Sequence, residues 1–222
     1  MLKIRVYRFL NGLRFRRKCS IIFSKYSRYT MIPRNIYISN LEIASEFKAI
    51  PGDVVECGVW KGGMIAGIAE VVGKKKYFLF DSFEGLPQAA EIDGINAINW
   101  QNNTSGENYF DNCTAEEQYA NEAMVLTGFD FKLIKGWFDE TLSHTPFVSS
   151  ISILRLDADW YDSTLTCLKY LFPKVSKGGV VIIDDYYTWD GCSRAVHFYL
   201  NSINSSSRIQ SKDGVAFIIK ND

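Results

Sequence analysis

Aspartate residues stand at the ends of two predicted strands in this sequence. Asp157 ends an apolar run over residues 150–157, and Asp184 and Asp185 follow the run that begins at residue 179. Neighbouring strands lie about 4.8 Å apart, so carboxylates at their ends can converge on one ion. Hard oxygen ligands favour Mg²⁺ or Ca²⁺ over Zn²⁺, and a partly hydrated Mg²⁺ can also hold substrate oxygens. We therefore expect Asp157, Asp184 and Asp185 to form a Mg²⁺ site.

Two alternatives to this metal site remain open. One aspartate at a strand end often caps the following helix or turn, although three on two strands are better explained by a shared cation, because clustered carboxylates repel one another. Asp159 also forms an Asp-Ala-Asp triplet with Asp157, a pattern typical of metal-dependent glycosyltransferases. Those enzymes have a nucleotide-binding region before the triplet, whereas here that region carries a glycine turn after Glu56. Because of the triplet, a metal-dependent glycosyltransferase is kept as the alternative function, although the glycine turn favours the first interpretation.

A glycine-rich turn follows Glu56, in the stretch Glu-Cys-Gly-Val-Trp-Lys-Gly-Gly that ends at Gly63. Gly58 permits a sharp turn after the strand, and Gly62 and Gly63 permit close approach of a ligand or of the next helix. A dinucleotide-binding fingerprint has glycine where this chain has Glu56. A carboxylate there repels a pyrophosphate but suits a ligand with a cationic amine, such as S-adenosylmethionine. Asp81 ends the next predicted strand, where a carboxylate can bind ribose hydroxyls.

The order of the predicted elements indicates how these residues would be brought together. Apolar runs predict strands at residues 53–57, 76–81, 129–135, 150–157, 179–184 and 215–219, and helices at 38–50, 63–72 and 162–172. This alternation predicts an α/β fold, with a mostly parallel sheet and helices on both faces. Residues 87–113 are polar and without period, which indicates a lid-like insertion. Thr114 and Glu117 then form a capping-box pattern at the start of another helix.

Charge is unevenly distributed, although the net charge of the 222 residues is zero. Residues 1–41 contain ten Lys or Arg and no acid, which leaves fifteen basic and twenty-five acidic residues in the rest. This acidic body, which we assign to one domain over residues 38–222, argues against a nucleic-acid partner. In the basic segment 1–37, arginines alternate with Leu2, Ile4, Val6, Phe9 and Leu10, which suits docking on an anionic membrane surface. The alternative is a solvated helix packed on the acidic body or on a second subunit of a homo-oligomer.

The cysteine pattern indicates a reducing compartment. Five cysteines, at positions 19, 57, 113, 167 and 192, form no CxxC pair, so neither a disulfide framework nor a zinc site is predicted. No apolar run reaches the length of a membrane-spanning helix, and arginines interrupt the N-terminus where a signal peptide would be apolar. We therefore expect a cytoplasmic protein with reduced thiols.

Five blocks of the sequence resemble, in the same order, the macrocin O-methyltransferase family. They are Val55–Gly63, Phe80–Pro87 (with Asp-Ser-Phe-Glu-Gly-Leu-Pro), Gly136–Leu142, Leu154–Thr164 and Ile182–Tyr186. The resemblance runs from about Ile38 to Val215. It implies a class I methyltransferase (Rossmann-like) fold, S-adenosylmethionine as methyl donor, and Mg²⁺ held by Asp157, Asp184 and Asp185. The acceptor that it implies is a hydroxyl of a sugar or of a glycosylated natural product.

The resemblance also implies roles for single residues. The cofactor-binding positions that it indicates are Glu56, Gly58, Trp60, Gly62, Asp81, Ser82 and Asp157, with Trp137 near the adenine. It assigns no general base, since the chain has two histidines, His144 and His197, and neither matches a catalytic position of the family. Asp159 and His144 are the candidates for taking the hydroxyl proton, whereas His197 is expected to be a packing residue.

Overall fold

A seven-stranded sheet forms the centre of the fold in the computed structural model, which describes residues 2–107 and 109–221, with side chains from Gly12 onward. The strands are β1 (Asp53–Cys57), β2 (Tyr77–Asp81), β3 (Phe131–Lys135), β4 (Ile151–Leu156), β5 (Val175–Ile183), β6 (Ile209–Lys212) and β7 (Val215–Ile219). Their order across the sheet is β3-β2-β1-β4-β5-β7-β6. Strand β7 pairs antiparallel with β5 and β6, and the other pairs are parallel. The predicted mostly parallel sheet is confirmed.

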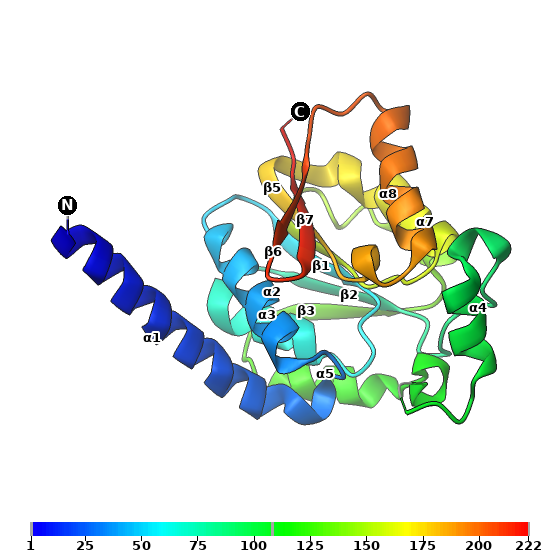
Figure 1. Cartoon of the computed structure of the whole chain (residues 1–222), viewed down its shortest axis with the longest axis horizontal. Helices are drawn as coiled ribbons and strands as arrows, with labels where there is room; N and C mark the ends of the chain where they lie inside the picture. Colours follow the sequence, from blue (N-terminus) through cyan, green and yellow to red (C-terminus); the bar gives the residue numbers. More distant parts are fainter. Residues whose placement is uncertain (1, 108, 222) are drawn as a thin grey trace.

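Helices cover both faces of the sheet, as predicted (Figure 1). One face carries α1 (Leu2–Tyr26), α2 (Arg34–Glu46), α3 (Gly63–Val72) and α5 (Glu117–Val125), and the other carries α6 (Phe138–Thr141), α7 (Tyr161–Leu171) and α8 (Asp190–Ser202). Because successive strand residues point to opposite faces, Val54 of β1 packs in the first core, and Val55 and Cys57 pack in the second. The sheet therefore separates two apolar cores.

Strands β1 and β4 lie side by side at the centre of the sheet. The chain passes outward from β1 to β3, returns to β4, and then continues outward in the opposite direction. In α/β sheets, the crevice at such a reversal binds ligands at the carboxyl ends of the strands. The residues after these two strands meet there, since the backbone nitrogen of Asp157 donates to the carbonyl oxygen of Cys57 at 2.9 Å.

The polar insertion contains more regular structure than predicted. A helix, α4 (Ile95–Asn102), lies between two 3₁₀ turns, Glu91–Asp93 and Phe110–Cys113. In this helix Ala97 is buried, and the ring centroid of Trp100 lies 6.2 Å from that of Trp160 and 5.9 Å from that of Trp189. A helix this short has too few apolar residues to show a period. The helix packs on tryptophans that are distant in the sequence, and a local sequence pattern does not reveal such contacts.

The capping-box prediction was wrong. Helix α5 begins at Glu117, and its N-cap residue is Glu116, which makes no side-chain capping hydrogen bond. Thr114 instead has extended backbone before the helix. Its carbonyl oxygen accepts a hydrogen bond from the indole Nε1 of Trp60 at 3.3 Å. Thr114 is thus bonded to the turn after β1 instead of capping α5.

The basic N-terminal segment forms α1, whose first half extends away from the rest of the molecule (Figure 1). Its second half packs on the body, where Cys19, Ile22 and Tyr26 are buried and Arg16 pairs with Glu42 at 3.2 Å. The side chains of Leu2, Ile4, Val6, Phe9 and Leu10 lie outside the described residues, so docking on a membrane surface stays a prediction. The boundary predicted after residue 37 falls within α2. Among the helices described, none has the length and apolar character needed to cross a membrane.

Candidate functional site

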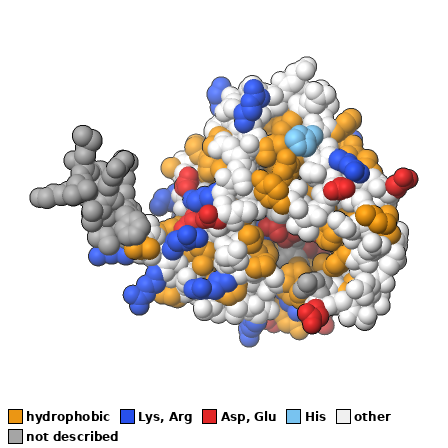
Figure 2. All heavy atoms as spheres, in the orientation of Figure 1, with side chains coloured by type: hydrophobic (Ala, Val, Ile, Leu, Met, Phe, Trp, Pro, Cys, Tyr) orange, Lys and Arg blue, Asp and Glu red, His pale blue; other side chains and the backbone are white. Residues whose placement is uncertain are grey.

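A cavity of about 990 Å³ opens at the carboxyl ends of the parallel strands. Figure 2 shows acidic side chains inside a hollow near the centre of this face. The predicted site residues that line the cavity are Glu56, Gly58, Trp60, Asp81, Ser82, Trp137, Asp157, Asp159, Asp184 and Asp185. Of the described residues predicted for the site, Gly62 and His144 do not line it. Its volume lies at the upper end of the usual range for ligand pockets, roughly 300–1,000 Å³, so it can hold two small ligands together.

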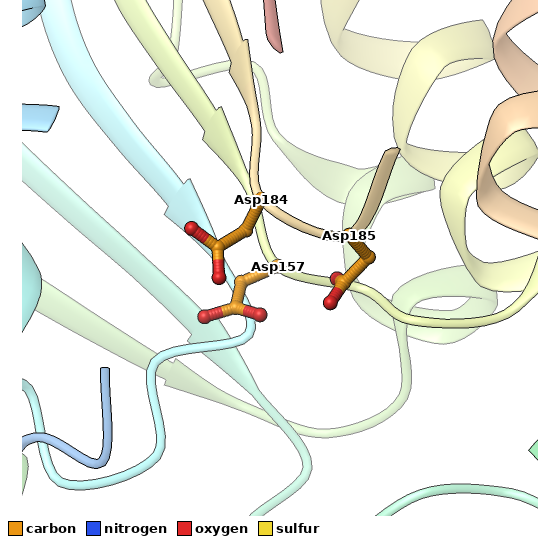
Figure 3. Close-up of side chains that lie close together, drawn as sticks. All are labelled: Asp157, Asp184 and Asp185. Carbon is orange, nitrogen blue, oxygen red and sulfur yellow. The ribbon is translucent and has the colours of Figure 1, made fainter. Parts of the chain in front are cut away.

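Three aspartates converge in this cavity (Figure 3). One carboxylate oxygen from each of Asp157, Asp184 and Asp185 lies within 4.8 Å of the others. The parallel pairing continues past the strand ends, because the backbone nitrogen of Asp184 donates to the carbonyl oxygen of Leu156 at 2.9 Å. Asp185 is buried, and its Oδ2 accepts a hydrogen bond from the backbone nitrogen of Asp159 at 3.1 Å. Hard oxygen donors are the ligand type that Mg²⁺ takes, so this cluster is a candidate Mg²⁺ site.

Arg155 of β4 contacts this cluster and was not predicted from the sequence. Its buried guanidinium donates from Nη1 to Glu56 Oε1 at 2.7 Å and to Asp157 Oδ2 at 2.9 Å. Nη2 lies 2.5 Å from Asp184 Oδ1, and Nε donates to Asn40 Oδ1 at 3.2 Å. One buried cation therefore joins the glycine-turn side of the cavity to the aspartate side. The signal for it was a charged residue in an apolar strand, since buried charges need partners.

The carboxylates around the cavity outnumber this cation. Burial raises the pKa of Glu56 to about 8, although Arg155 opposes the shift. Burial, and then the charge of Asp184, raise the pKa of Asp157 to about 6. Burial and the neighbouring aspartates raise the pKa of Asp185 well above its ordinary value. These shifts reflect the cost of gathering negative charge out of water, which a divalent cation would reduce, so the electrostatics also fit a metal ion.

The glycine turn after β1 depends on Gly58. Its φ of +80° lies in the left-handed region, and a Cβ at this position would lie 1.7 Å from the backbone oxygen of Asp157. The ends of β1 and β4 therefore approach too closely for any side chain here. Gly62 also has a φ of +80°, but its close neighbour is Ala120 of α5. Gly62 thus permits packing of α5 on the turn.

We expect Gly58→Ala to lower the free energy of unfolding by more than about 2 kcal/mol. Left-handed backbone alone costs a residue with a Cβ about 1–2 kcal/mol, and the Asp157 carbonyl must also move. Denaturant unfolding followed by circular dichroism measures the change. Gly128→Ala is the matched control, because its φ is +72° but nothing lies within 4 Å of an added Cβ. Equal losses in the two variants would show that the contact with Asp157 imposes no constraint.

Asp81 holds the same turn from the end of β2. Its Oδ2 accepts hydrogen bonds from the backbone nitrogens of Val59 and Trp60, at 2.6 and 2.8 Å, and its Oδ1 accepts one from that of Phe83 at 2.7 Å. Burial raises the pKa of Asp81, and these hydrogen bonds oppose the rise. A carboxylate has about four acceptor sites, so most of this side chain's capacity serves the loop. The bond to a ribose hydroxyl stays a prediction that the remaining site permits.

The two candidates for the general base lie in different environments. Asp159 lines the cavity, and its Oδ1 accepts a hydrogen bond from Trp189 Nε1 at 3.0 Å. Burial, and then the charge of Asp157, raise the pKa of Asp159 to about 8. His144 is exposed in a 3₁₀ turn outside the cavity wall. His197, which was expected to pack, is exposed on α8, with its Nε2 2.9 Å from the Tyr186 hydroxyl.

The segment between α1 and α2 also borders the cavity, although it was predicted to lie outside the domain. Residues 29–33 line the wall, and Tyr29 is buried. Gly63 shows how closely this segment lies to the glycine turn, because a Cβ on Gly63 would lie 2.6 Å from the backbone oxygen of Tyr29. No periodic or motif signal marks these residues in the sequence.

Comparison with known proteins identifies the family. The profile of the macrocin O-methyltransferase family (TylF) matches residues 26–220. The chain belongs to this family. The match includes residues 29–33, so the macrocin O-methyltransferase pattern extends further toward the N-terminus than the five blocks indicated.

Two relatives and one solved structure illustrate the likeness to known proteins. The demethyldecarbamoylnovobiocin O-methyltransferase of Streptomyces niveus is 35% identical over 179 residues, which cover 75% of this chain and 65% of that protein. The 8-demethyl-8-(2,3-dimethoxy-alpha-L-rhamnosyl)-tetracenomycin-C 4'-O-methyltransferase of Streptomyces olivaceus is 34% identical over 171 residues, 74% of this chain and 64% of that protein. The chain thus spans just under two thirds of the length of these relatives. The structure of the O-methyltransferase NovP has a TM-score of 0.72 at 27% identity, covering 87% of this chain and 83% of NovP, in keeping with the class I methyltransferase fold.

Proposed function

We propose that this chain is an S-adenosylmethionine- and Mg²⁺-dependent O-methyltransferase that acts on a hydroxyl of a sugar or of a glycosylated small molecule. The observation that carries the proposal is one cavity that joins the turn after Glu56 to the cluster of Asp157, Asp184 and Asp185. Both relatives are named as O-methyltransferases, and the name of one includes a rhamnosyl group. Family membership favours this function over the metal-dependent glycosyltransferase that the Asp-Ala-Asp triplet suggested.

Glu56 is the residue best placed to bind the cationic amine of the cofactor. Its Oε1 is bonded by Arg155, whereas its Oε2 is buried and has no hydrogen-bond partner among the described residues. A buried acceptor without a partner is uncommon in folded proteins, and an ammonium group in the cavity would supply the missing donor. Asp81 and Trp137, which line the same cavity, would contact the ribose and the adenine.

The aspartate side of the cavity would hold Mg²⁺ through Asp157, Asp184 and Asp185. A bound Mg²⁺ supplies charge stabilisation and orientation for the acceptor hydroxyl. Asp159 would take the proton of that hydroxyl, and the indole N–H of Trp189 holds its carboxylate in place. Methyl transfer is an in-line displacement, so the protein must aim one oxygen at the methyl group. Strands β1, β4 and β5 end at one cavity, so the groups that would bind the cofactor and those that would bind the acceptor are held close together.

Tryptophans form the wall of the cavity next to Asp159. Trp100 and Trp189 both line it, and both pack against the buried ring of Trp160. The Nε1 of Trp160 donates to the carbonyl oxygen of Pro87 at 2.9 Å, which ties the insertion to this wall. Large aromatic rings at a pocket surface bind the apolar faces of ligands. We place the acceptor ring against Trp100 and Trp189.

We also propose that the protein is cytoplasmic, that its acceptor is a small molecule, and that it has no nucleic-acid partner. All five cysteines are free thiols, which is typical of a reducing compartment. The acidic balance of residues 42–222 disfavours contact with a polyanion. Membrane contact or a homo-oligomer formed through α1 stays a prediction.

We expect S-adenosylhomocysteine to raise the melting temperature of the protein. A ligand that binds only the folded state stabilises it by about 2.7 kcal/mol at 100 times its Kd, which corresponds to roughly 5–10 °C for a domain of this length. Differential scanning fluorimetry measures the shift, and Glu56→Gln should reduce it. A rise with NADH or a nucleotide sugar but none with S-adenosylhomocysteine would contradict the proposed function.

A further inference from the structure

Arg155 has contacts that the proposed reaction does not require. Its side chain is 1% exposed, and its guanidinium contacts Glu56, Asp157, Asp184 and Asn40. Asp157 and Asp184 are two of the three proposed metal ligands. Burying an ion pair costs the hydration of both charges, and this cost often exceeds the attraction that is gained. The arginine therefore calls for an explanation in terms of the carboxylates around it.

The contacts of Arg155 use one carboxylate oxygen of each of the two aspartates. Arg155 lies against Oδ2 of Asp157 and Oδ1 of Asp184. Each carboxylate has a second oxygen, and a metal ion requires only one oxygen from each ligand of the cluster. In Figure 3 the carboxylates of Asp157 and Asp184 lie next to each other, with Asp185 beside them. The guanidinium and a divalent cation can therefore hold the same two side chains at the same time.

We propose that Arg155 is a built-in counter-ion of the metal centre. It holds Asp157 and Asp184 in their ligand positions before the divalent cation binds, and its own charge makes the site bind that cation more weakly than the carboxylates alone would. Arg155 is thus a positioning residue, because it acts through the two aspartates and not on the reacting groups. This inference rests on the proposed Mg²⁺ centre.

Removal of the guanidinium has two opposite consequences under this proposal. Without Mg²⁺, the carboxylates of Glu56, Asp157 and Asp184 lose their shared partner, and buried charges left unpaired destabilise a fold strongly. With Mg²⁺, the repulsion between a single and a double positive charge a few ångströms apart disappears. Even with the screening of bulk water, that repulsion corresponds to about tenfold in affinity at a separation of about 6 Å. An arginine with a structural role alone would produce the first consequence without the second.

Two variants of the full chain separate these effects. Arg155→Met removes the charge and keeps much of the side-chain volume, whereas Arg155→Lys keeps the charge. Calorimetric titration with Mg²⁺, in the absence of cofactor, measures the affinity, and melting temperatures are compared in EDTA and in Mg²⁺. We expect Arg155→Met to melt below wild type in EDTA, to gain more from Mg²⁺ than wild type, and to bind Mg²⁺ about tenfold more tightly. Arg155→Lys should bind Mg²⁺ within about threefold of wild type.

The remaining outcomes are also decisive. Folding of Arg155→Met in Mg²⁺ but not in EDTA supports the proposal, whereas Mg²⁺ affinity that is unchanged or lower than that of wild type overturns it. If Arg155→Met folds in neither buffer, Glu56→Gln decides, because it removes one negative partner and leaves Arg155 to the two aspartates. Mg²⁺ binding must then weaken, and unchanged binding overturns the inference. Wild-type protein that binds no Mg²⁺ removes the metal centre itself, which is a failure of the proposed function.

Discussion

Asp184→Asn should reduce the rate of methyl transfer at least about 100-fold, while the affinity for S-adenosylhomocysteine stays within about threefold of wild type. Charge stabilisation by a catalytic metal is worth several kcal/mol, and each 1.4 kcal/mol is a factor of ten in rate. Asp184 follows β5, whereas Glu56 lies on β1, and β4 separates the two strands. The metal and cofactor functions should therefore separate at this residue more cleanly than at Asp157, which follows β4.

The same measurements on Asp213→Asn provide the matched control. Asp213 lies in the turn between β6 and β7, with its side chain 56% exposed and paired with Arg16, so both rate and affinity should be unchanged. Loss of cofactor binding together with activity in Asp184→Asn would point to a defect transmitted by Arg155. Asp185→Asn then tests the metal without disturbing Arg155, because the hydrogen bond described for the Asp185 carboxylate comes from the backbone nitrogen of Asp159 and not from Arg155. Activity that survives these substitutions and full chelation would remove the metal from the mechanism.

The positions of the aspartates were predictable from the sequence because a parallel sheet imposes a simple pattern. Buried strands appear as apolar runs, and the first polar residue after a run lies at the edge of the sheet where ligands bind. This places Asp157, Asp184 and Asp185 at one edge without any knowledge of their contacts. Strand bounds were less accurate. For example, β5 begins at Val175 and not at residue 179, because Lys177 and two glycines interrupt the apolar run.

Features that depend on contacts between distant residues were not predictable in this way. Arg155 lies 99 residues from Glu56 and 115 from Asn40 in the chain, so its strand reveals that it needs partners but not which ones. The positions of helix α4 and of residues 29–33 also depend on contacts with residues distant in sequence. Trp100 of α4 packs on Trp160 and Trp189, and the backbone of Tyr29 lies against Gly63. The candidate bases show the limit most clearly. Asp159 and His144 can both accept a proton, and the sequence did not decide between them, whereas the structure places Asp159 in the cavity wall and His144 outside it.

An acceptor with two adjacent hydroxyls should be methylated at least about 100-fold more efficiently, in kcat/KM, than its analogue that lacks the hydroxyl next to the reacting one. Three carboxylates leave about three positions on a six-coordinate Mg²⁺. A vicinal diol would fill two of these positions and so would have a fixed orientation, whereas a lone alcohol would bind through one oxygen and would be free to rotate.

The structure adds a second constraint on the same acceptor. With its hydroxyls directed at the aspartates, its ring would lie along Trp100 and Trp189, which line the cavity beside Asp159. An analogue that lacks a hydroxyl elsewhere on the ring is therefore the matched control, and it should lose much less, because neither chelation nor the aromatic contact requires that group. Methyl transfer measured by mass spectrometry over a range of acceptor concentrations gives kcat/KM for all three compounds. Equal values for the diol and the analogue without the adjacent hydroxyl would show that chelation is not how the protein holds the proposed acceptor. The orientation of the reacting oxygen would then have to come from the tryptophan wall and Asp159.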